Sequence, residues 1–133
     1  GAPIIYVNDE GIPAVQQLLD RLATQYPTAF QPQTQPFMFS PHGTVYDRWH
    51  IAMEAEAIQG ASNKQTPEQG MKAVAAGFLK RLGLTEGWTP LSNRMSIEIR
   101  NAWEAACANV NRHPTRPYLT TDRPVPSFFQ ESH

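Results

Sequence analysis

The sequence predicts a mainly α-helical domain, because apolar residues recur every three or four positions in three separate segments. These segments are 13–25, 67–82 and 90–111. Such spacing places the apolar side chains along one face of an α-helix, where they can be buried together. We expect a fourth helix at 45–59 and a short strand at 3–7. The expected fold is therefore about four helices packed as one compact domain with a short N-terminal strand.

The helix expected at 13–25 follows a short run of residues that favours a strand. The run from Pro3 to Val7 is rich in β-branched and aromatic side chains, and Asn8 ends it. The apolar stripe of the helix consists of Val15, Leu18, Leu19, Leu22 and Tyr26. The connection at 9–11 contains a single glycine and two carboxylates, so it lacks the composition of a phosphate-binding loop. No cofactor is expected.

The segment 45–59 fits two structures. Apolar and polar residues alternate from Val45 to Ala55, which is typical of a strand. The run from Ala52 to Ala57 is rich in residues of high helix propensity, which favours a helix. We therefore expect a helix at 45–59. The alternative is an α+β fold with a small antiparallel sheet that includes 45–55.

The helix at 67–82 has well-marked ends. The Thr66 hydroxyl can accept a hydrogen bond from the first turn, Pro67 suits the first helical position, and Gln69 completes a capping box. Gly83 is expected in the left-handed conformation that ends many helices. The apolar stripe consists of Met71, Val74, Ala75, Phe78, Leu79 and Leu82.

The helix at 90–111 is expected to begin at Pro90 and to end before Pro114, since the residue before a proline disfavours helical geometry. The link at 83–88 is short, so this helix and the helix at 67–82 are expected to be antiparallel neighbours. The residues expected to be largely buried in the core are Leu18, Leu22, Val74, Phe78, Leu82, Ile99 and Trp103.

The character of the chain changes after the last predicted helix. Residues 1–112 are expected to form a single globular domain, and 113–133 a Pro-rich extended arm docked on that domain or on a partner subunit. Phe128 and Phe129 lie near the end of this arm. Two adjacent phenyl rings gain free energy by burial, so at least one is expected to be buried.

Composition limits the classes of partner. The net charge is −1, and basic residues exceed acidic residues only in the second half of the chain. A strongly basic protein that binds nucleic acid or anionic lipid is therefore not favoured. No apolar run is long enough to cross a membrane, so the expected localisation is cytoplasmic, with a secreted form after signal-peptide removal as the alternative. The single cysteine, Cys107, forms no internal disulfide and no metal-binding spacing.

Few residues of the sequence are candidates for metal binding or catalysis. On a helix, Asp47, His50 and Glu54 would share one face, where they could bind a divalent metal or act in acid–base catalysis. The tight spacing of known metal-binding helices is missing, so these are weak candidates and no metal is expected. Ser40 and His42, with Asp47, are residue types of a hydrolase triad, but no nucleophile-elbow motif accompanies them.

The leading functional expectation is a small non-enzymatic domain that binds another protein or a second copy of itself. The first alternative is a nucleic-acid-associated protein that uses the basic C-terminal half. The second is a metal-dependent or acid–base enzyme at the three candidate residues of segment 45–59. The residues expected to take part in an interaction are Arg112, Arg116, Tyr118, Arg123, Phe128 and Phe129.

Overall fold

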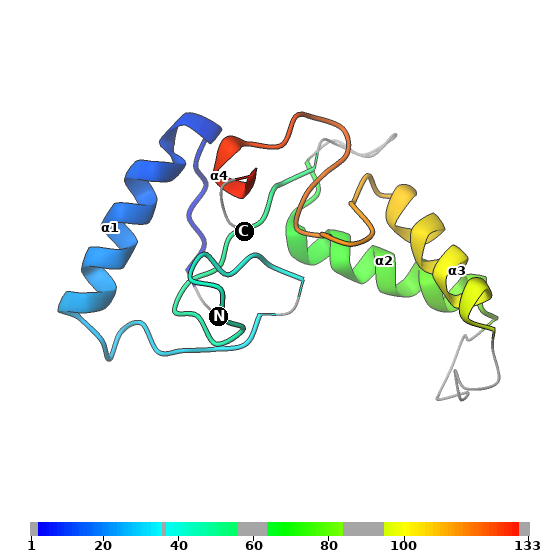
Figure 1. The fold of residues 1–133 in the computed structure, drawn as a ribbon, viewed down its shortest axis with the longest axis horizontal. Helices are drawn as coiled ribbons and strands as arrows, with labels where there is room; N and C mark the ends of the chain where they lie inside the picture. Colours follow the sequence, from blue (N-terminus) through cyan, green and yellow to red (C-terminus); the bar gives the residue numbers. More distant parts are fainter. Residues whose placement is uncertain (1–2, 36, 56–63, 84–94, 131–133) are drawn as a thin grey trace. The chain divides into compact units, whose positions relative to one another are not determined.

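The computed structural model describes residues 3–35, 37–55, 64–83 and 95–130 of the 133-residue chain. The fold is mainly helical, as predicted (Figure 1). Its elements are the 3-10 helix η1 (Asp9–Gly11) and the helices α1 (Ile12–Gln25), α2 (Pro67–Arg81), α3 (Ser96–Ala108) and α4 (Ser127–Gln130). The chain divides into two units: unit 1 takes its described residues from 3–35, 40–50 and 125–130, and unit 2 from 37–39 and 51–124.

Helix α1 is the longest element of unit 1, and it confirms the prediction at 13–25. Asn8 begins the η1 turn ahead of it, because the Asn8 side-chain oxygen accepts a hydrogen bond from the Gly11 N–H at 2.8 Å. Ile12 and Ala23 are buried, whereas Leu18 is 46% exposed. The expected burial of Leu18 is therefore wrong. Ile12 and Ala23 lie about three turns apart on one side of the helix, and this side, which does not include Leu18, faces inward.

The strand predicted at 3–7 is not formed. Residues 3–8 belong to no strand or bridge within the described part of the chain. Ile4, Ile5 and Tyr6 are each at least 60% exposed. A run of β-formers becomes a strand only where a neighbouring strand pairs with it, so side-chain propensity alone is not enough.

The helix predicted at 45–59 is wrong over residues 45–55, and 56–59 lie outside the described residues. Phe39 and Ile51 form an antiparallel bridge, and Ala55 and Gln65 form another. The buried side chains of this segment lie at alternate positions and are Asp47, Trp49, Met53 and Ala55. Burial of alternate positions thus outweighs the helix propensity of 52–57. The bridges are isolated, so the sheet of the alternative fold is not formed among the described residues.

Helix α2 begins with the predicted capping box. The Gln69 N–H donates to the Thr66 hydroxyl at 3.2 Å, and the Thr66 N–H donates to the Gln69 side-chain oxygen at 3.0 Å. Gly83, just beyond the helix, has the expected left-handed φ of 74°. The prediction at 67–82 is confirmed to within one residue at its C-terminal end.

Helix α3 is shorter than the predicted helix at 90–111. The predicted start lies in 84–94, which is outside the described residues. At the other end, Asn111 adopts a left-handed φ of 58°, and the Arg112 N–H donates to the Cys107 carbonyl at 2.9 Å, which closes the helix early. Asparagine tolerates this conformation better than most residues. Helices α2 and α3 are in contact and run in opposite directions, as predicted (Figure 1).

The core of unit 2 lies between α2 and α3. Its buried members are Val74, Leu82, Ala102, Ala106, Cys107 and Val110. Phe78 and Trp103 are partly buried and pack against this core. Ile99 is also only partly buried, and so is Leu22 in unit 1. The prediction of burial is therefore confirmed for Val74 and Leu82, while the large aromatic side chains remain at the edge of the core.

The segment after α3 turns back on unit 2. Thr120 forms an antiparallel bridge with Arg112, and the Met53 N–H donates to the Tyr118 carbonyl at 2.8 Å. The segment is not extended throughout, because the short helix α4 occupies Ser127–Gln130. Phe129 in α4 is 2% exposed, so at least one of the two phenyl rings is buried, as expected. The division into a domain at 1–112 and an arm at 113–133 stays a prediction.

Candidate functional site

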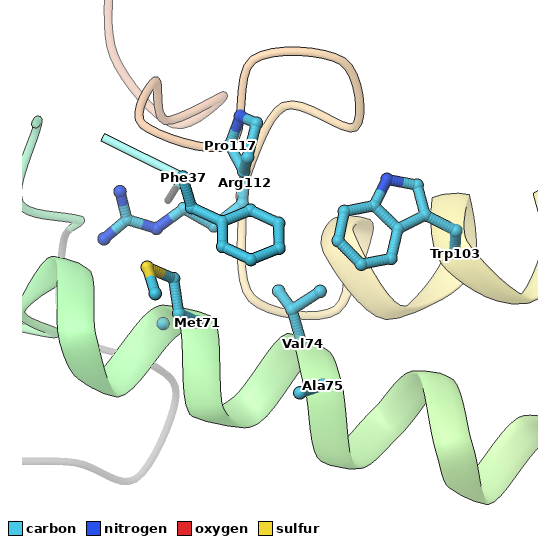
Figure 2. A pocket seen from close by; sticks show the side chains of 8 residues that line it. Phe37, Met71, Val74, Ala75, Trp103, Arg112 and Pro117 are labelled. Carbon is cyan, nitrogen blue, oxygen red and sulfur yellow. The ribbon is translucent and has the colours of Figure 1, made fainter. Parts of the chain in front are cut away.

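A small apolar hollow lies on the surface of unit 2 beside α2 and α3. We call it the Phe37 hollow, and it is lined by Phe37, Gly70, Met71, Val74, Ala75, Trp103, Arg112 and Pro117. Figure 2 shows Phe37, Val74 and Trp103 facing one another across it, while the Arg112 guanidinium extends away from Trp103. The capped helix α2 supplies four of the lining residues, and so the floor of the hollow belongs to a regular, well-anchored element.

Phe37 is the most unusual residue of this hollow. Its φ is 66°, in the left-handed region that a bulky side chain seldom adopts. Its ring stacks on Trp103 with a centroid separation of 5.8 Å and an interplanar angle of 27°, yet the residue is 43% exposed. A conformation of this kind costs about 1–3 kcal/mol and is enriched at binding sites. Phe37 is thus held in a strained backbone position with part of its ring open to solvent.

Trp103 is fixed more firmly than Phe37. Its indole N–H donates to the Pro114 carbonyl at 2.7 Å. The edge-to-face contact between its ring and Phe78 has a centroid separation of 5.6 Å. The Trp103 ring on which Phe37 stacks is therefore held by a hydrogen bond at one edge and by a ring contact with Phe78.

Arg112 lies behind the hollow and is 2% exposed. One of its terminal nitrogens donates to the Met53 carbonyl at 2.7 Å. Its Nε and other terminal nitrogen are buried without a hydrogen-bond partner in the structure, as is the Gln65 side-chain oxygen. Burial lowers the Arg112 pKa, and the negative charges of Asp122 and Glu54 partly offset this effect. In this structure the guanidinium therefore serves contacts within its own unit.

The hollow is too small for a cofactor. Its volume is about 20 Å³, comparable to the space that one water molecule needs. Sites for small molecules usually have volumes of about 300–1,000 Å³. What the hollow offers instead is a shallow apolar surface between the exposed Phe37 ring and the partly buried side chains of Trp103 and Met71.

A second group of polar side chains surrounds His42 in unit 1. The His42 Nδ1 atom lies 2.7 and 2.8 Å from the two carboxylate oxygens of Asp47, and Nε2 lies 3.0 Å from Oδ1 of Asp20. The Trp49 indole N–H donates to the same Asp20 oxygen at 2.9 Å. An open groove of about 420 Å³ lies beside these residues. Its size falls within the range of small-molecule sites.

The two partners in this group shift one another's pKa values. Burial raises the Asp47 pKa, but hydrogen bonds from the His42 ring and from the backbone N–H groups of His42 and Arg48 outweigh burial and lower it. Burial lowers the His42 pKa, but the hydrogen bonds and charges of Asp47 and Asp20 outweigh burial and raise it. Both shifts favour an ionised carboxylate paired with an imidazolium.

The sequence hypothesis for Asp47, His50 and Glu54 lacks its structural basis. Residues 45–55 are not helical, so no helical face joins the three side chains. Among the described residues, no group of three or more histidine, cysteine or acidic side chains could hold a metal ion. Asp47 is instead paired with His42, and burial lowers the His50 pKa despite the Asp47 charge. Of the three residue types of a hydrolase triad, Asp47 does contact the His42 ring. The Nε2 atom of that ring, however, faces Asp20 rather than Ser40.

The residues predicted to take part in an interaction lie in different surroundings. Arg116, Tyr118 and Arg123 are partly buried in unit 2, and the Tyr118 ring contacts Phe39 with a centroid separation of 5.2 Å. Phe128 is half-buried and packs edge-to-face on Phe129 in unit 1. The predicted residues are therefore divided between the two units, and their part in an interaction stays a prediction.

Cys107 is buried in the α2–α3 core, and burial raises its pKa, which disfavours the reactive thiolate. No described helix is both long and apolar enough to cross a bilayer. Comparison with protein-family models, curated proteins and solved structures finds no match to this chain. Function must therefore be inferred from the geometry.

Sequence reasoning missed Phe37 and Asp20. Nothing in the sequence around Phe37 indicates that its φ would be positive. Asp20 lies on the polar side of a predicted helix, far in sequence from His42. The one available signal was the pair His42 and Asp47, whose residue types suggested an oriented imidazole.

Proposed function

We propose that this chain is a small non-enzymatic protein-binding domain, and that the Phe37 hollow is its contact site. The observation that supports this proposal most directly is the combination of strain and exposure at Phe37. A bulky residue at φ 66° with a 43% exposed ring contributes less to the stability of its own unit than a buried phenylalanine would. Packing against a partner would bury the part of the ring that packing within its own unit leaves exposed.

The composition of the hollow favours a protein as the partner. Aromatic residues and methionine are enriched in protein interfaces relative to the rest of the protein surface. Phe37, Met71 and Trp103 supply these residue types around one hollow, whereas the Arg112 guanidinium is buried behind it. The small volume disfavours a cofactor, whereas an apolar side chain of a partner can cover Phe37 and Trp103 without entering a deep cavity.

The partner is either a different protein that presents an apolar side chain or a second copy of this chain. Site-specific photo-crosslinking tests the site itself. A photoreactive phenylalanine analogue at position 37 should form cross-links to protein, and the cross-linked species is identified by mass spectrometry. The same analogue at Leu79 on α2, which is 44% exposed, is the matched control and should not cross-link.

A substitution provides the second arm of the test. Phe37→Asn removes the ring, but asparagine suits a left-handed backbone. This variant should therefore retain the fold and no longer bind the partner that the cross-linking identifies. The partner-binding loss is measured by sedimentation velocity, with Leu79→Gln as the control. Equal cross-linking at positions 37 and 79, or unchanged binding by Phe37→Asn, would contradict the proposal.

The nucleic-acid alternative has less support because Arg112 is 2% exposed and so cannot neutralise a phosphate at the surface in this structure. Fluorescence anisotropy with single-stranded DNA at low and high salt tests it directly. Binding that weakens steeply as salt rises would favour this alternative over the protein-binding proposal.

A further inference from the structure

The contacts of His42 require a particular protonation state. Both ring nitrogens face carboxylate oxygens, with Asp47 at 2.7 Å from Nδ1 and Asp20 at 3.0 Å from Nε2. A neutral imidazole has one N–H and one lone pair, so it can donate to only one of the two carboxylates. The other nitrogen would then present a lone pair to a negatively charged oxygen. The observed geometry fits the imidazolium, which donates on both sides.

These contacts join two separate segments of unit 1. Asp20 belongs to α1, whereas His42 and Asp47 belong to the segment 40–50. Asp20 accepts from the His42 ring and from the Trp49 indole at the same oxygen. Asp47, in turn, is held in its own segment by the backbone N–H groups of His42 and Arg48. The contacts of the His42 ring and the Trp49 indole with α1 thus converge on one carboxylate.

We propose that His42 is a pH-dependent latch that fastens α1 to the segment 40–50 through Asp20. The latch is closed while the imidazole carries both protons. When the imidazole loses a proton, its contact with one carboxylate changes from attraction to repulsion. The contact with Asp47 is retained, because both residues lie in one segment and a backbone N–H also links them. The contact with Asp20 is therefore the one that opens.

The other charged groups around His42 favour this assignment. Besides His42, the ionisable residues that line the groove are Asp20, Tyr46, Asp47 and Arg48. The Trp49 ring meets the His42 ring edge-on at a centroid separation of 5.8 Å. His50 is the second histidine close to Asp47, but burial lowers its pKa, so it titrates on the acidic side of the ordinary value of 6.5.

The direction of the effect follows from linkage. The His42 pKa is raised above 6.5 in the folded chain, so the latch is fully closed below that pH and opens as pH rises through the raised value. Opening exposes α1 to local motion and widens the groove of about 420 Å³ on the α1 side. Alkaline conditions therefore favour access to the groove.

Nuclear magnetic resonance on the full chain tests the latch. The chain is titrated upward from about pH 5 while the His42 ring and the Trp49 indole N–H are followed. We expect both signals to change with one common midpoint above the ordinary histidine value. Amide exchange of α1, corrected for intrinsic rates, should accelerate about tenfold for each pH unit by which that midpoint exceeds 6.5.

Three variants separate the latch from general structural effects. His42→Gln should abolish the Trp49 transition and leave α1 exchange fast at every pH. Asp20→Asn keeps an acceptor for Trp49 but removes the charge, so the His42 midpoint should fall. His113→Gln is the control, because His113 contacts Thr115 rather than this group, and it should leave the midpoint unchanged. A Trp49 transition that persists in His42→Gln, or an Asp20→Asn midpoint equal to that of the unchanged chain, would overturn the proposal.

Discussion

Replacing Gly70 by alanine should destabilise the chain, although the same change usually stabilises a helix. In the interior of a helix, alanine is favoured over glycine by about 0.5–1 kcal/mol. At position 70, however, an added Cβ would lie 2.8 Å from Arg112 Nε, 2.8 Å from the Gln65 side-chain oxygen and 3.2 Å from a terminal nitrogen of Arg112. Arg112 is 2% exposed and hydrogen-bonded to the Met53 carbonyl, so it cannot move aside freely.

The magnitude follows from these contacts. Overpacking a filled interior costs about 1–3 kcal/mol, and a hydrogen bond to a charged group contributes about 1.5–3 kcal/mol when it is lost. After the gain in helix propensity, we expect the free energy of unfolding of Gly70→Ala to fall by about 1–3 kcal/mol. Urea denaturation followed by the helical circular-dichroism signal measures this change.

Gly77 in the same helix provides the matched control. An added Cβ there would lie 2.8 Å from an Arg81 terminal nitrogen, but that nitrogen ends an exposed and flexible side chain. Gly77→Ala should therefore raise the free energy of unfolding by about 0.5–1 kcal/mol. In an Arg112→Leu background, Gly70→Ala should lose the part of its cost that comes from Arg112 and keep the part that comes from the Gln65 side-chain oxygen. The reasoning is refuted if Gly70→Ala is as stable as Gly77→Ala.

Three further predictions concern the end of the chain, the start of α2 and pH. Phe129→Ala should lower the free energy of unfolding by about 3–5 kcal/mol, and Phe128→Ala by clearly less, because Phe129 is 2% exposed whereas Phe128 is half-buried. Equal losses in thermal denaturation would contradict this order. Thr66→Ala should cost about 0.5–2 kcal/mol, since it removes the oxygen that caps α2, and an unchanged urea midpoint would show that the cap is dispensable. Stability measured between about pH 5 and 8 should be greatest near 6.5: the lowered His50 pKa removes stability below that value and the raised His42 pKa removes it above, so a flat profile would contradict both assignments.

The elements with local signals could be predicted from the sequence. The capping box at Thr66, the left-handed Gly83 and the apolar stripes placed α1 and α2 to within one residue at each end. These features depend on side chains that interact with the backbone a few residues away. The C-terminal end of α3 was predicted too far along the chain, because the left-handed residue that closes the helix is Asn111 rather than a glycine.

The elements that depend on distant partners could not be predicted. In the segment 45–55, bridges to Phe39 and Gln65 override the helix propensity of the chain. The candidate sites are similar in this respect. Phe37 stacks on Trp103, and Asp20 contacts His42. The residues of each pair lie too far apart in the sequence for helix or strand periodicity to bring them together. Sequence reasoning could identify chemically capable residues, but only the fold determines which of them meet.

Unit 1 is built from segments that lie far apart in the sequence, and this affects the order in which the chain folds during synthesis. Unit 1 combines residues 3–35 with 125–130, whereas unit 2 is drawn from 37–39 and 51–124. Contacts between segments so far apart require the closure of a very long loop, which slows folding. Domains fold as their residues emerge from the ribosome, so unit 2 can form first. Helix α1 must therefore wait for the synthesis of α4 before unit 1 is complete.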